Sequence, residues 1–464
     1  MSDITIECGN NIELLKKYPD NYFDSVVTDC PYGLGKEPNA LKLLQDWIDQ
    51  GYHEIKGKGF MGKAWDSFVP QPMFWKEVFR VLKPGGHVLA FFGTRTYDWG
   101  TMAIRLSGFE IRDMITWHYG SGFPKSLDIS KQIDKMTGAE RQVVGSKLTG
   151  TMAGQNGNLN IKNGWKSGQQ MIDVTVPTTD EAKQWNGYGT ALKPATEPIC
   201  VARKPLIGTV AENVLKYGTG GINIDGCRIK FKSDEDLKSA TYGTGTNILG
   251  ANYVGSKLTD GRKNIEANSD GRFPANVILD LHMANVLDKQ TGVLTSGIPS
   301  GIRNASNNIY GQYATGQDVT GYGDTGGASR FFYCAKASQE ERNSGCEHIE
   351  AIKTNDGRQI ETDNAFQRGK NERNNNHPTV KPISLMRYLQ RLVTPVGGIT
   401  LDPYAGSGTS GCSAAFENIN IVLMEMEDDY IPIIEARTKY WQNKANREKY
   451  IQELKDSQYN LFSA

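Results

Sequence analysis

Apolar residues in the first 125 positions alternate between short continuous runs and helical spacing. The β-branched run from Phe23 to Thr28 predicts a buried parallel strand. The spacing over Phe74 to Leu82 predicts a helix, which Lys83 to Gly86 should end. His87 to Phe92 and Phe109 to Trp117 predict two more strands. This alternation is typical of an α/β domain with a mainly parallel sheet.

The last third of the chain repeats this pattern. Apolar spacing predicts a helix over Ile383 to Val393, introduced by Pro378 and Pro382. The expected elements after it are a strand over 398–401, a helix through Ala415, a strand over 419–424 and a helix over 429–441. Both ends of the chain therefore predict the same kind of layered α/β structure.

The middle of the chain has a different composition. From about residue 140 to 330, Gly, Asn, Thr, Ser and Tyr dominate, and the hexapeptide Val144 to Thr149 recurs as Val254 to Thr259. Tyr-Gly-Thr recurs at Tyr188, Tyr217 and Tyr242. These repeats are too few and uneven for a solenoid. They predict a loop-rich region, so we expect one α/β domain that a large insertion splits in sequence.

Composition narrows the class of protein further. The 464 residues exceed one ordinary single-core domain, and 38% hydrophobic residues are enough for a real core. The formal net charge is zero, so overall charge does not indicate nucleic acid, although a local basic groove would suffice. The seven scattered cysteines form no Cys-x-x-Cys pair, and no apolar run approaches ~20 residues. We expect a soluble cytoplasmic protein without a metal site, a disulfide framework or a membrane segment.

A glycine-rich turn follows the strand predicted at 398–401. Gly406-Ser407-Gly408 lies between a strand and a helix, where glycine lets a backbone approach a ligand and the helix offers free N–H groups. Any tight strand-to-helix turn can look similar. Glu425 ends the next predicted strand, where a carboxylate can accept hydrogen bonds from ribose hydroxyls. Because no Gly-Lys-Ser/Thr follows, a nucleoside ligand fits better than a P-loop triphosphate.

The second candidate motif is Asp29-Cys30-Pro31-Tyr32, at the end of a predicted strand. The exocyclic amine of a base is a poor nucleophile, and a carboxylate with a backbone carbonyl can hold its two N–H groups and direct its lone pair to a methyl donor. Pro31 would fix the turn, and the ring of Tyr32 could stack on an extruded base. The alternative is an ordinary turn in which Asp29 caps the chain and Tyr32 packs.

Together these motifs resemble a known family. Thr28 to Gly33, Asp402 to Thr409 and His377 to Pro382 resemble motifs IV, I and X of the amino DNA methyltransferases, in the permuted order of the β-class. The resemblance implies a Rossmann-like class I methyltransferase fold, discontinuous in sequence. Its expected parts are a catalytic half (1–125), an inserted target-recognition region (126–330) and a cofactor-binding half (331–464). The segments 60–66, 119–126 and 330–336 resemble solitary phage and prophage enzymes.

The resemblance also implies residue roles. Asp29 would bind the target amine, Cys30 would offer its carbonyl, Pro31 would stiffen the loop and Tyr32 would stack on the flipped base. The cofactor would be S-adenosyl-L-methionine. Its expected binding residues are Asn10, Asp29, Thr379, Lys381, Asp402, Tyr404, Gly406, Ser407, Gly408, Thr409 and Glu425.

Two positions depart from the family pattern. Cys30 replaces the usual Pro of the catalytic loop, and Asn10 stands where an acidic residue near the adenine is usual. Cys30 also raises the alternative of carbon-5 methylation of cytosine by a Cys nucleophile. That family carries Pro before Cys, whereas here Cys precedes Pro beside Asp29, so amine chemistry fits better.

The expected function is methyl transfer to an exocyclic amine of double-stranded DNA, directly to a flipped-out base and without a metal. Asp29 at the first loop position favours adenine N6, and cytosine N4 is the alternative. RNA or protein-glutamine methylation fits the permuted order less well. A catalytically silent DNA-binding or anti-restriction protein is a further alternative. We expect a DNA-modification role, as in restriction-modification systems, and a monomer or homodimer.

Other residues are candidates for contacting DNA. The basic and polar run from Arg368 to Asn376 could follow a DNA backbone or form a solvated linker. The three residues from Trp117 to Tyr119 could form a wall of the target pocket or belong to the core. The three from Phe331 to Tyr333 are more typical of core packing than of base stacking.

Overall fold

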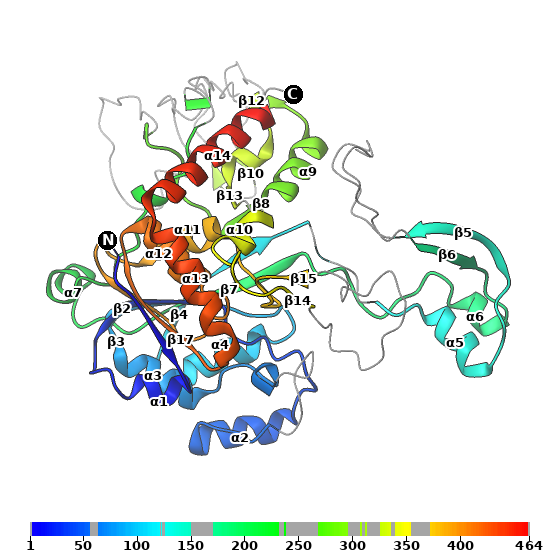
Figure 1. The fold of residues 1–464 in the computed structure, drawn as a ribbon, viewed down its shortest axis with the longest axis horizontal. Helices are drawn as coiled ribbons and strands as arrows, with labels where there is room; N and C mark the ends of the chain where they lie inside the picture. The colour runs from blue at the N-terminus through cyan, green and yellow to red at the C-terminus, as the bar shows by residue number, and fades with distance from the viewer. Residues whose placement is uncertain are drawn as a thin grey trace.

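A mixed sheet forms the centre of the molecule (Figure 1). The computed structural model describes residues 2–55, 64–120, 122, 126–149, 170–231, 236–237, 268–295, 307–308, 311–312, 325–335, 339–353 and 372–462. Within these residues nine strands join in the order β1 (Ile4–Cys8), β17 (Asn420–Glu425), β16 (Ile399–Asp402), β2 (Phe23–Thr28), β3 (Leu82–Phe91), β7 (Thr196–Arg203), β4 (Glu110–His118), β8 (Val277–Asp280) and β13 (Tyr333–Ala335).

Strand β7 runs against its two neighbours, while the other adjacent pairs in the described sheet are parallel. Strands β7 and β8 both come from the range 126–330, which was expected to be an insertion throughout. The boundaries expected at 125 and 330 therefore do not coincide with the edges of the sheet. The run Ile199 to Ala202 is buried between β3 and β4. This apolar run is short and lies within a polar stretch of sequence, so it was not predicted as a strand.

Side chains alternate between the two faces of the sheet, as a pleated strand requires. Val26, Val88 and Cys200 belong to one core cluster, whereas Val27, Leu89 and Ile199 belong to another. The helices that pack on the first face are α1 (Asn11–Leu15), α2 (Ala40–Gln50), α3 (Pro72–Val81) and α4 (Tyr97–Leu106). Those on the other face include α11 (Ile383–Val393), α12 (Thr409–Glu417) and α13 (Ile431–Gln442).

Most predicted elements of the two ends are confirmed. Strand β2 and helix α11 have the predicted bounds, and β4, β16, α12, β17 and α13 lie within three residues of theirs. One difference is at the segment Lys83 to Gly86, which lies inside β3 instead of before it. Leu82 pairs with Phe23 and His87 pairs with Ser25. The segment Lys83 to Gly86 between these pairs is therefore an irregularity within β3 that the strand accommodates.

A small unit projects from the sheet, at the right of Figure 1. It consists of α5 (Ile129–Thr137), β5 (Val143–Thr149), β6 (Gln170–Thr175) and α6 (Asp180–Gln184), and we call it the projecting module. Its two connections pair with each other, since Asp128 bridges Gly189 and the Ser126 hydroxyl accepts from the N–H of Thr190. The first copy of the repeated hexapeptide lies in β5, and the second lies outside the described residues.

The structure describes further elements around this sheet. The helices are α7 (Val210–Tyr217), α9 (Leu281–Thr291), α10 (Gln339–Asn343) and α14 (Lys444–Phe462). Short antiparallel pairs join β9 (Leu294–Thr295) to β12 (Thr325–Gly326), β10 (Asn307–Asn308) to β11 (Gly311–Gln312) and β14 (Ile352–Lys353) to β15 (Glu372–Arg373). Among the described helices, none has the length and apolar composition needed to cross a membrane.

Candidate active site

The backbone of the loop that follows β2 is fixed by the buried carboxylate of Asp66. Asp66 Oδ1 accepts hydrogen bonds from the backbone N–H groups of Tyr32 (3.1 Å) and Gly33 (3.0 Å). Gly33 has a φ of 65°, and a Cβ there would lie 2.9 Å from the backbone nitrogen of Val69. The hydroxyl of Thr96 donates to the carbonyl of Tyr32. The loop is therefore fixed by contacts that the motif alone did not reveal, although Asp66 lies in a segment that resembled the family.

Asp29 lies in contact with Lys381 at this loop. The resemblance to the amino DNA methyltransferases assigns both residues to one site. Lys381 Nζ lies 2.6 Å from Asp29 Oδ2 and 3.2 Å from the hydroxyl of Tyr32. That hydroxyl lies 3.1 Å from Asp29 Oδ1 and 2.9 Å from Glu197 Oε2. Glu197 Oε2 is also 3.3 Å from Lys381 Nζ. We call Asp29, Tyr32, Glu197 and Lys381 the site cluster.

Electrostatics in the site cluster keep both donors protonated. Burial alone would lower the pKa of Lys381, but the charges of Asp29 and Glu197 raise it above its ordinary value. Burial, with the same two carboxylates, raises the pKa of Tyr32 well above its ordinary value. The cluster thus holds an ammonium and a neutral phenol against two carboxylates.

The thiol of Cys30 points away from this cluster and into the core. Cys30 is 2% exposed, and its Sγ donates to the carbonyl of Phe91 at 3.0 Å. Burial, followed by the charge of Asp29, raises the pKa of this thiol well above its ordinary value. A thiolate nucleophile is disfavoured at such a position, which argues against carbon-5 chemistry.

Asp402 joins the catalytic loop to the glycine turn. Its Oδ1 accepts from the Thr28 hydroxyl at 2.7 Å and from the backbone N–H of Tyr404 at 3.2 Å, and its Oδ2 accepts from the Ser410 hydroxyl. Asp402 is buried, and burial raises its pKa to about 6. The ring of Tyr404 packs on Phe74. These two predicted cofactor residues thus make internal contacts that position the turn.

The glycine turn is shaped by its own packing. Gly406 and Gly408 have φ values of 54° and 73°, and Cβ atoms there would lie 2.8 Å from His377 Nε2 and 2.9 Å from Ile434 Cγ2. Their lack of a side chain is therefore required by these neighbours and by the backbone conformation. Burial lowers the pKa of His377 to about 4, so the imidazole under the turn is neutral at physiological pH.

A buried arginine anchors the centre of the turn. Arg437 Nη1 donates to the carbonyl (2.6 Å) and hydroxyl (3.0 Å) of Ser407 and to the hydroxyl of Thr409 (3.0 Å). The side chains of these two predicted cofactor residues therefore face Arg437. Nothing in the local motif pointed to an arginine 30 residues after Ser407.

Glu425 and Asn10 lie beside the turn at the ends of β17 and β1. Glu425 Oε2 accepts from the N–H of Gly406 at 2.8 Å, and its Oε1 accepts from the N–H groups of Met426 and Glu427. Burial raises the pKa of Glu425 above its ordinary range. Asn10 Oδ1 caps α1, accepting from Ile12 and Glu13. Within the described residues, the Asn10 amide nitrogen and the Thr379 hydroxyl have no hydrogen-bond partner.

Of the three aromatic residues from Trp117 to Tyr119, the first two end β4 and the third follows it. Trp117 is buried in the core, whereas Tyr119 is only partly buried and lies close enough to Glu197 for that charge to help raise its pKa. Farther along the chain, Tyr333 stacks on Tyr388 with ring centroids 4.1 Å apart, as core packing predicts, while Phe331 is exposed.

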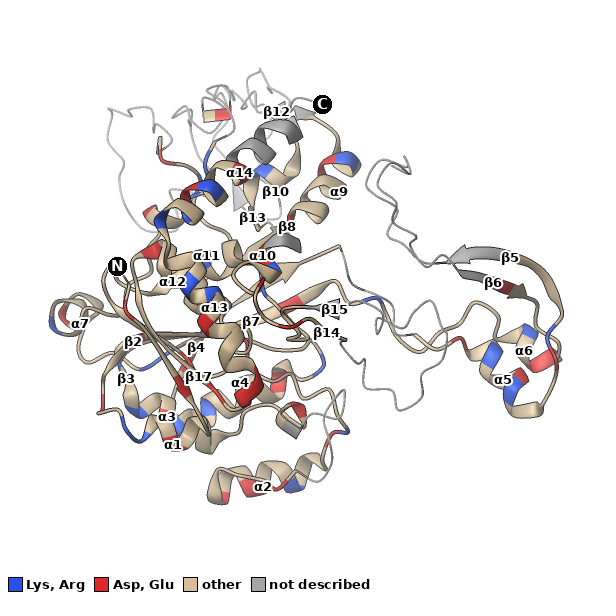
Figure 2. Cartoon of the chain, viewed as in Figure 1, with Lys and Arg blue, Asp and Glu red and all other residues tan. Residues whose placement is uncertain are grey.

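The predicted DNA-contacting run is only partly described, because 368–371 lie outside the described residues. In the described part of the run, Asn374 donates to the carbonyl of Ile349 and Asn375 donates to that of Arg342. This part of the run therefore packs against the protein and is not a solvated linker. The projecting module carries both signs of charge (Figure 2), with lysines on α5 and mainly acidic residues on α6. It does not form a basic patch in the described residues.

A family model described as DNA methylase, named for N6 and N4 methyltransferases, matches residues 23–141 and 310–436, which is more than half of the chain. The chain belongs to this DNA methylase family. The matched residues include the catalytic loop, Lys381, the glycine turn and Glu425.

Two curated relatives match part of the chain. Type II methyltransferase M.HpaI from Haemophilus parainfluenzae is 28% identical over 144 residues, which is 28% of this chain and 37% of the relative. Type II methyltransferase M.ScaI from Streptomyces caespitosus is 25% identical over 134 residues, 29% of this chain and 40% of the relative. The match therefore spans about two fifths of each relative's length.

Solved structures resemble this one weakly. The cytosine-N4-specific PvuII DNA methyltransferase has a TM-score of 0.40 and 14% identity over 94% of this chain and 86% of that chain. A putative DNA modification methylase from Thermus thermophilus, complexed with S-adenosyl-L-methionine, has a TM-score of 0.36 and 12% identity, covering 94% of this chain and 93% of that one. Nothing further follows from TM-scores this low.

Proposed function

We propose that this protein is an S-adenosyl-L-methionine-dependent DNA methyltransferase that acts on the exocyclic amine of a base in double-stranded DNA, with adenine N6 favoured. Membership of the DNA methylase family supports the class of reaction. The observation that carries the proposal is the position of Asp29, a partly buried carboxylate at the end of β2 that lies 2.6 Å from Lys381 and beside the turn after β16.

The residues around the glycine turn fit the proposed cofactor. The turn lies between β16 and α12, and Glu425 and Asn10 flank it from the ends of β17 and β1. A carboxylate oxygen has two acceptor positions, and within the described residues Gly406 is the one donor to Glu425 Oε2. Glu425 can therefore accept a ribose hydroxyl, and the amide of Asn10 can donate to an adenine. Thr379 and Lys381 would hold the carboxylate of the methionine part.

The residues of the catalytic loop would prepare the target amine. Asp29 would accept one N–H and the carbonyl of Cys30 the other, which directs the nitrogen lone pair. When bound, S-adenosyl-L-methionine supplies a methyl group on a positively charged sulfur. Its thioether would be the leaving group, and Asp29 would accept the proton that the amine loses and pass it to water. The phenol of Tyr32 would lie against the flipped base.

The test is incubation of the protein with methyl-labelled cofactor and unmethylated duplex DNA, followed by mass analysis of the nucleosides. N6-methyladenine is the expected product, and N4-methylcytosine would assign the other amine. DNA binding and cofactor binding without any methyl transfer would contradict the proposal and favour a catalytically silent DNA-binding protein. Transfer to RNA or to a protein glutamine, with none to DNA, would contradict the proposed substrate.

A further inference from the structure

Glu197 is a carboxylate in the site that the motifs did not include. It accepts from the hydroxyl of Tyr32 at 2.9 Å and lies 3.3 Å from Lys381 Nζ. Burial, and then the charge of nearby Glu197, raise the pKa of Tyr119 to about 12. Two side chains from distant segments, Tyr32 and Lys381, thus converge on Glu197.

The sheet topology explains how Glu197 reaches the site. Strand β7 is antiparallel to β3 and β4, so its first residues lie where those strands end. Glu197 pairs with Trp117 near the end of β4, and Ile199 pairs with Phe91 at the end of β3. Because the carboxyl ends of parallel strands form the functional edge of such a sheet, the reversed strand delivers its beginning to that edge.

The contacts of Asp29 create a competition that Glu197 can relieve. Lys381 occupies one oxygen of Asp29, and the hydroxyl of Tyr32 lies within hydrogen-bond distance of the other. A phenol has one proton, so Tyr32 can donate to Asp29 or to Glu197 but not to both at once. When Tyr32 donates to Glu197, Asp29 Oδ1 keeps both of its acceptor positions for a substrate N–H.

We infer that Glu197 is a positioning residue for methyl transfer: it accepts from the hydroxyl of Tyr32 and shares the charge of Lys381, leaving Asp29 able to accept the target amine. This inference rests on the proposed function for its substrate. Glu197 forms no bond to the base or the methyl group. It acts through Tyr32, which would lie against the flipped base, and through Lys381.

The first test compares Glu197→Gln and Glu197→Ala by the turnover of methyl transfer to unmethylated duplex DNA. Glu197→Gln keeps an acceptor for Tyr32 but loses the charge, so kcat should fall about tenfold, and Glu197→Ala should lose about 100-fold, the scale of a misplaced reacting group. The dissociation constant for cofactor alone should change less than kcat does, because Glu425, Asn10 and Thr379 are untouched and Lys381 keeps its charge. Wild-type kcat in both variants would overturn the inference.

A double-mutant cycle tests whether Tyr32 acts through Glu197. If Tyr32→Phe acts by losing its bond to Glu197, then combining it with Glu197→Ala should cost no more than Glu197→Ala alone. Simple addition of the two losses would show independent roles and contradict the shared positioning.

Glu110→Gln is the matched control for the fold. Glu110 pairs with Arg203 at 2.7 Å and joins β4 to β7 at the other end of the same pair of strands. Its loss should affect thermal unfolding at least as much as Glu197→Gln does, with kcat unchanged. If instead kcat falls equally in both variants, Glu197 has only a structural role and the inference is wrong.

A final readout does not depend on activity. Glu197 is one of two carboxylates that raise the pKa of Lys381, so in Glu197→Gln the amine should react faster with acetic anhydride, measured by mass spectrometry of the peptide containing Lys381. Unchanged labelling would overturn the arrangement described above. If the wild type transfers no methyl group to DNA but the labelling changes as expected, the proposed function fails and the contact network of Glu197 stands.

Discussion

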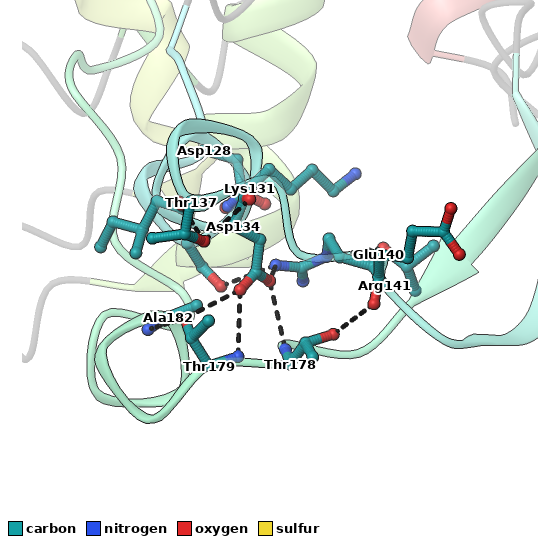
Figure 3. A network of polar contacts seen from close by, with 12 residues as sticks. Asp128, Lys131, Asp134, Thr137, Glu140, Arg141, Thr178, Thr179 and Ala182 are labelled. Carbon is teal, nitrogen blue, oxygen red and sulfur yellow. Dashed lines mark hydrogen bonds and ion pairs between the residues drawn. The ribbon is translucent and has the colours of Figure 1, made fainter.

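Two carboxylates in this molecule are each surrounded by hydrogen-bond donors, yet their surroundings differ. Asp134 in the projecting module accepts from Arg141 (2.6 Å) and from Thr178 and Thr179, all within 45 residues of it (Figure 3). Asp29 accepts from a lysine 352 residues away. Two of the donors to Asp134 are backbone N–H groups, whereas the donors to Asp29 are side chains.

We propose that this difference separates a structural carboxylate, Asp134, from a functional one, Asp29. Backbone donors hold Asp134 in one arrangement and join α5 to the segment before α6. The role of Asp134 is therefore to stabilise the projecting module. Side chains such as those of Lys381 and Tyr32 can change partners without unfolding the sheet. A substrate N–H can therefore replace a donor at Asp29, while replacing one at Asp134 would break the module.

The largest expected effect of a change around Asp29 comes from Lys381→Met. Removing the ammonium leaves Asp29 and Glu197 as two carboxylates around one phenol, which is unfavourable in a partly buried site. We expect methyl transfer to fall about 100-fold. Lys381→Arg, which keeps the charge, should lose less, and equal losses in the two variants would contradict an electrostatic role.

A tenfold effect is expected at the glycine turn. Gly406→Ala would place a Cβ 2.8 Å from His377 Nε2 at a φ of 54°, so the turn or the imidazole must move. We expect the dissociation constant for S-adenosyl-L-methionine to rise about tenfold, because the turn would shift to relieve the backbone strain and the close contact with His377. Gly397→Ala is the control, since it shares a positive φ of 74° but meets nothing within 4 Å. Equal effects would assign the loss to strain alone.

Asp134→Asn should affect stability within the projecting module. The change removes the charge opposite Arg141, and we expect amide exchange at Thr178 and Thr179 to accelerate about tenfold, measured by hydrogen exchange. Asp180→Asn is the control, because Asp180 is exposed and its one ion pair among the described residues is with the exposed side chain of Lys183. Unchanged exchange in Asp134→Asn would contradict the structural role.

The same carboxylate predicts how the module responds to acid. Removal from water acts to raise the pKa of Asp134, but the hydrogen bonds from Thr179, Thr178 and Arg141 prevail and hold this pKa below its ordinary value. A lowered folded-state pKa contributes stability above the unfolded value of ~3.9, and that stability is lost as pH falls through the folded value. Protection of the Thr178 and Thr179 amides, measured as exchange relative to the intrinsic rate at the same pH, should therefore fall on acidification below about pH 4, and this loss of protection should vanish in Asp134→Asn.

The smallest expected effect is that of Cys30→Ala. The loop would use the backbone carbonyl of Cys30, which alanine keeps, so methyl transfer should stay within about threefold of the wild type. Loss of all activity in this variant, with normal folding, would instead support a thiol nucleophile and carbon-5 chemistry.

The sequence predicted those parts of the molecule whose information is local. The β-branched run of β2 and the apolar spacing of α11 gave their bounds, and the catalytic loop and Lys381 were expected at one site. The place of β7 could not be predicted, because apolar runs do not encode strand order or direction. Glu197 was missed for this reason, since only the reversed strand brings it to the site.

The central claim is that Asp29 is the carboxylate that prepares the target amine. Its most direct test compares methyl transfer to duplex DNA by the Asp29→Asn variant with that by a control variant, Asp24→Asn. Asp24 lies on β2, the strand that leads to Asp29, and pairs with Lys83 at 2.5 Å. We predict that Asp29→Asn loses roughly 10²- to 10³-fold in kcat with wild-type thermal unfolding, whereas Asp24→Asn lowers stability and keeps kcat. Undiminished kcat in Asp29→Asn would contradict the account.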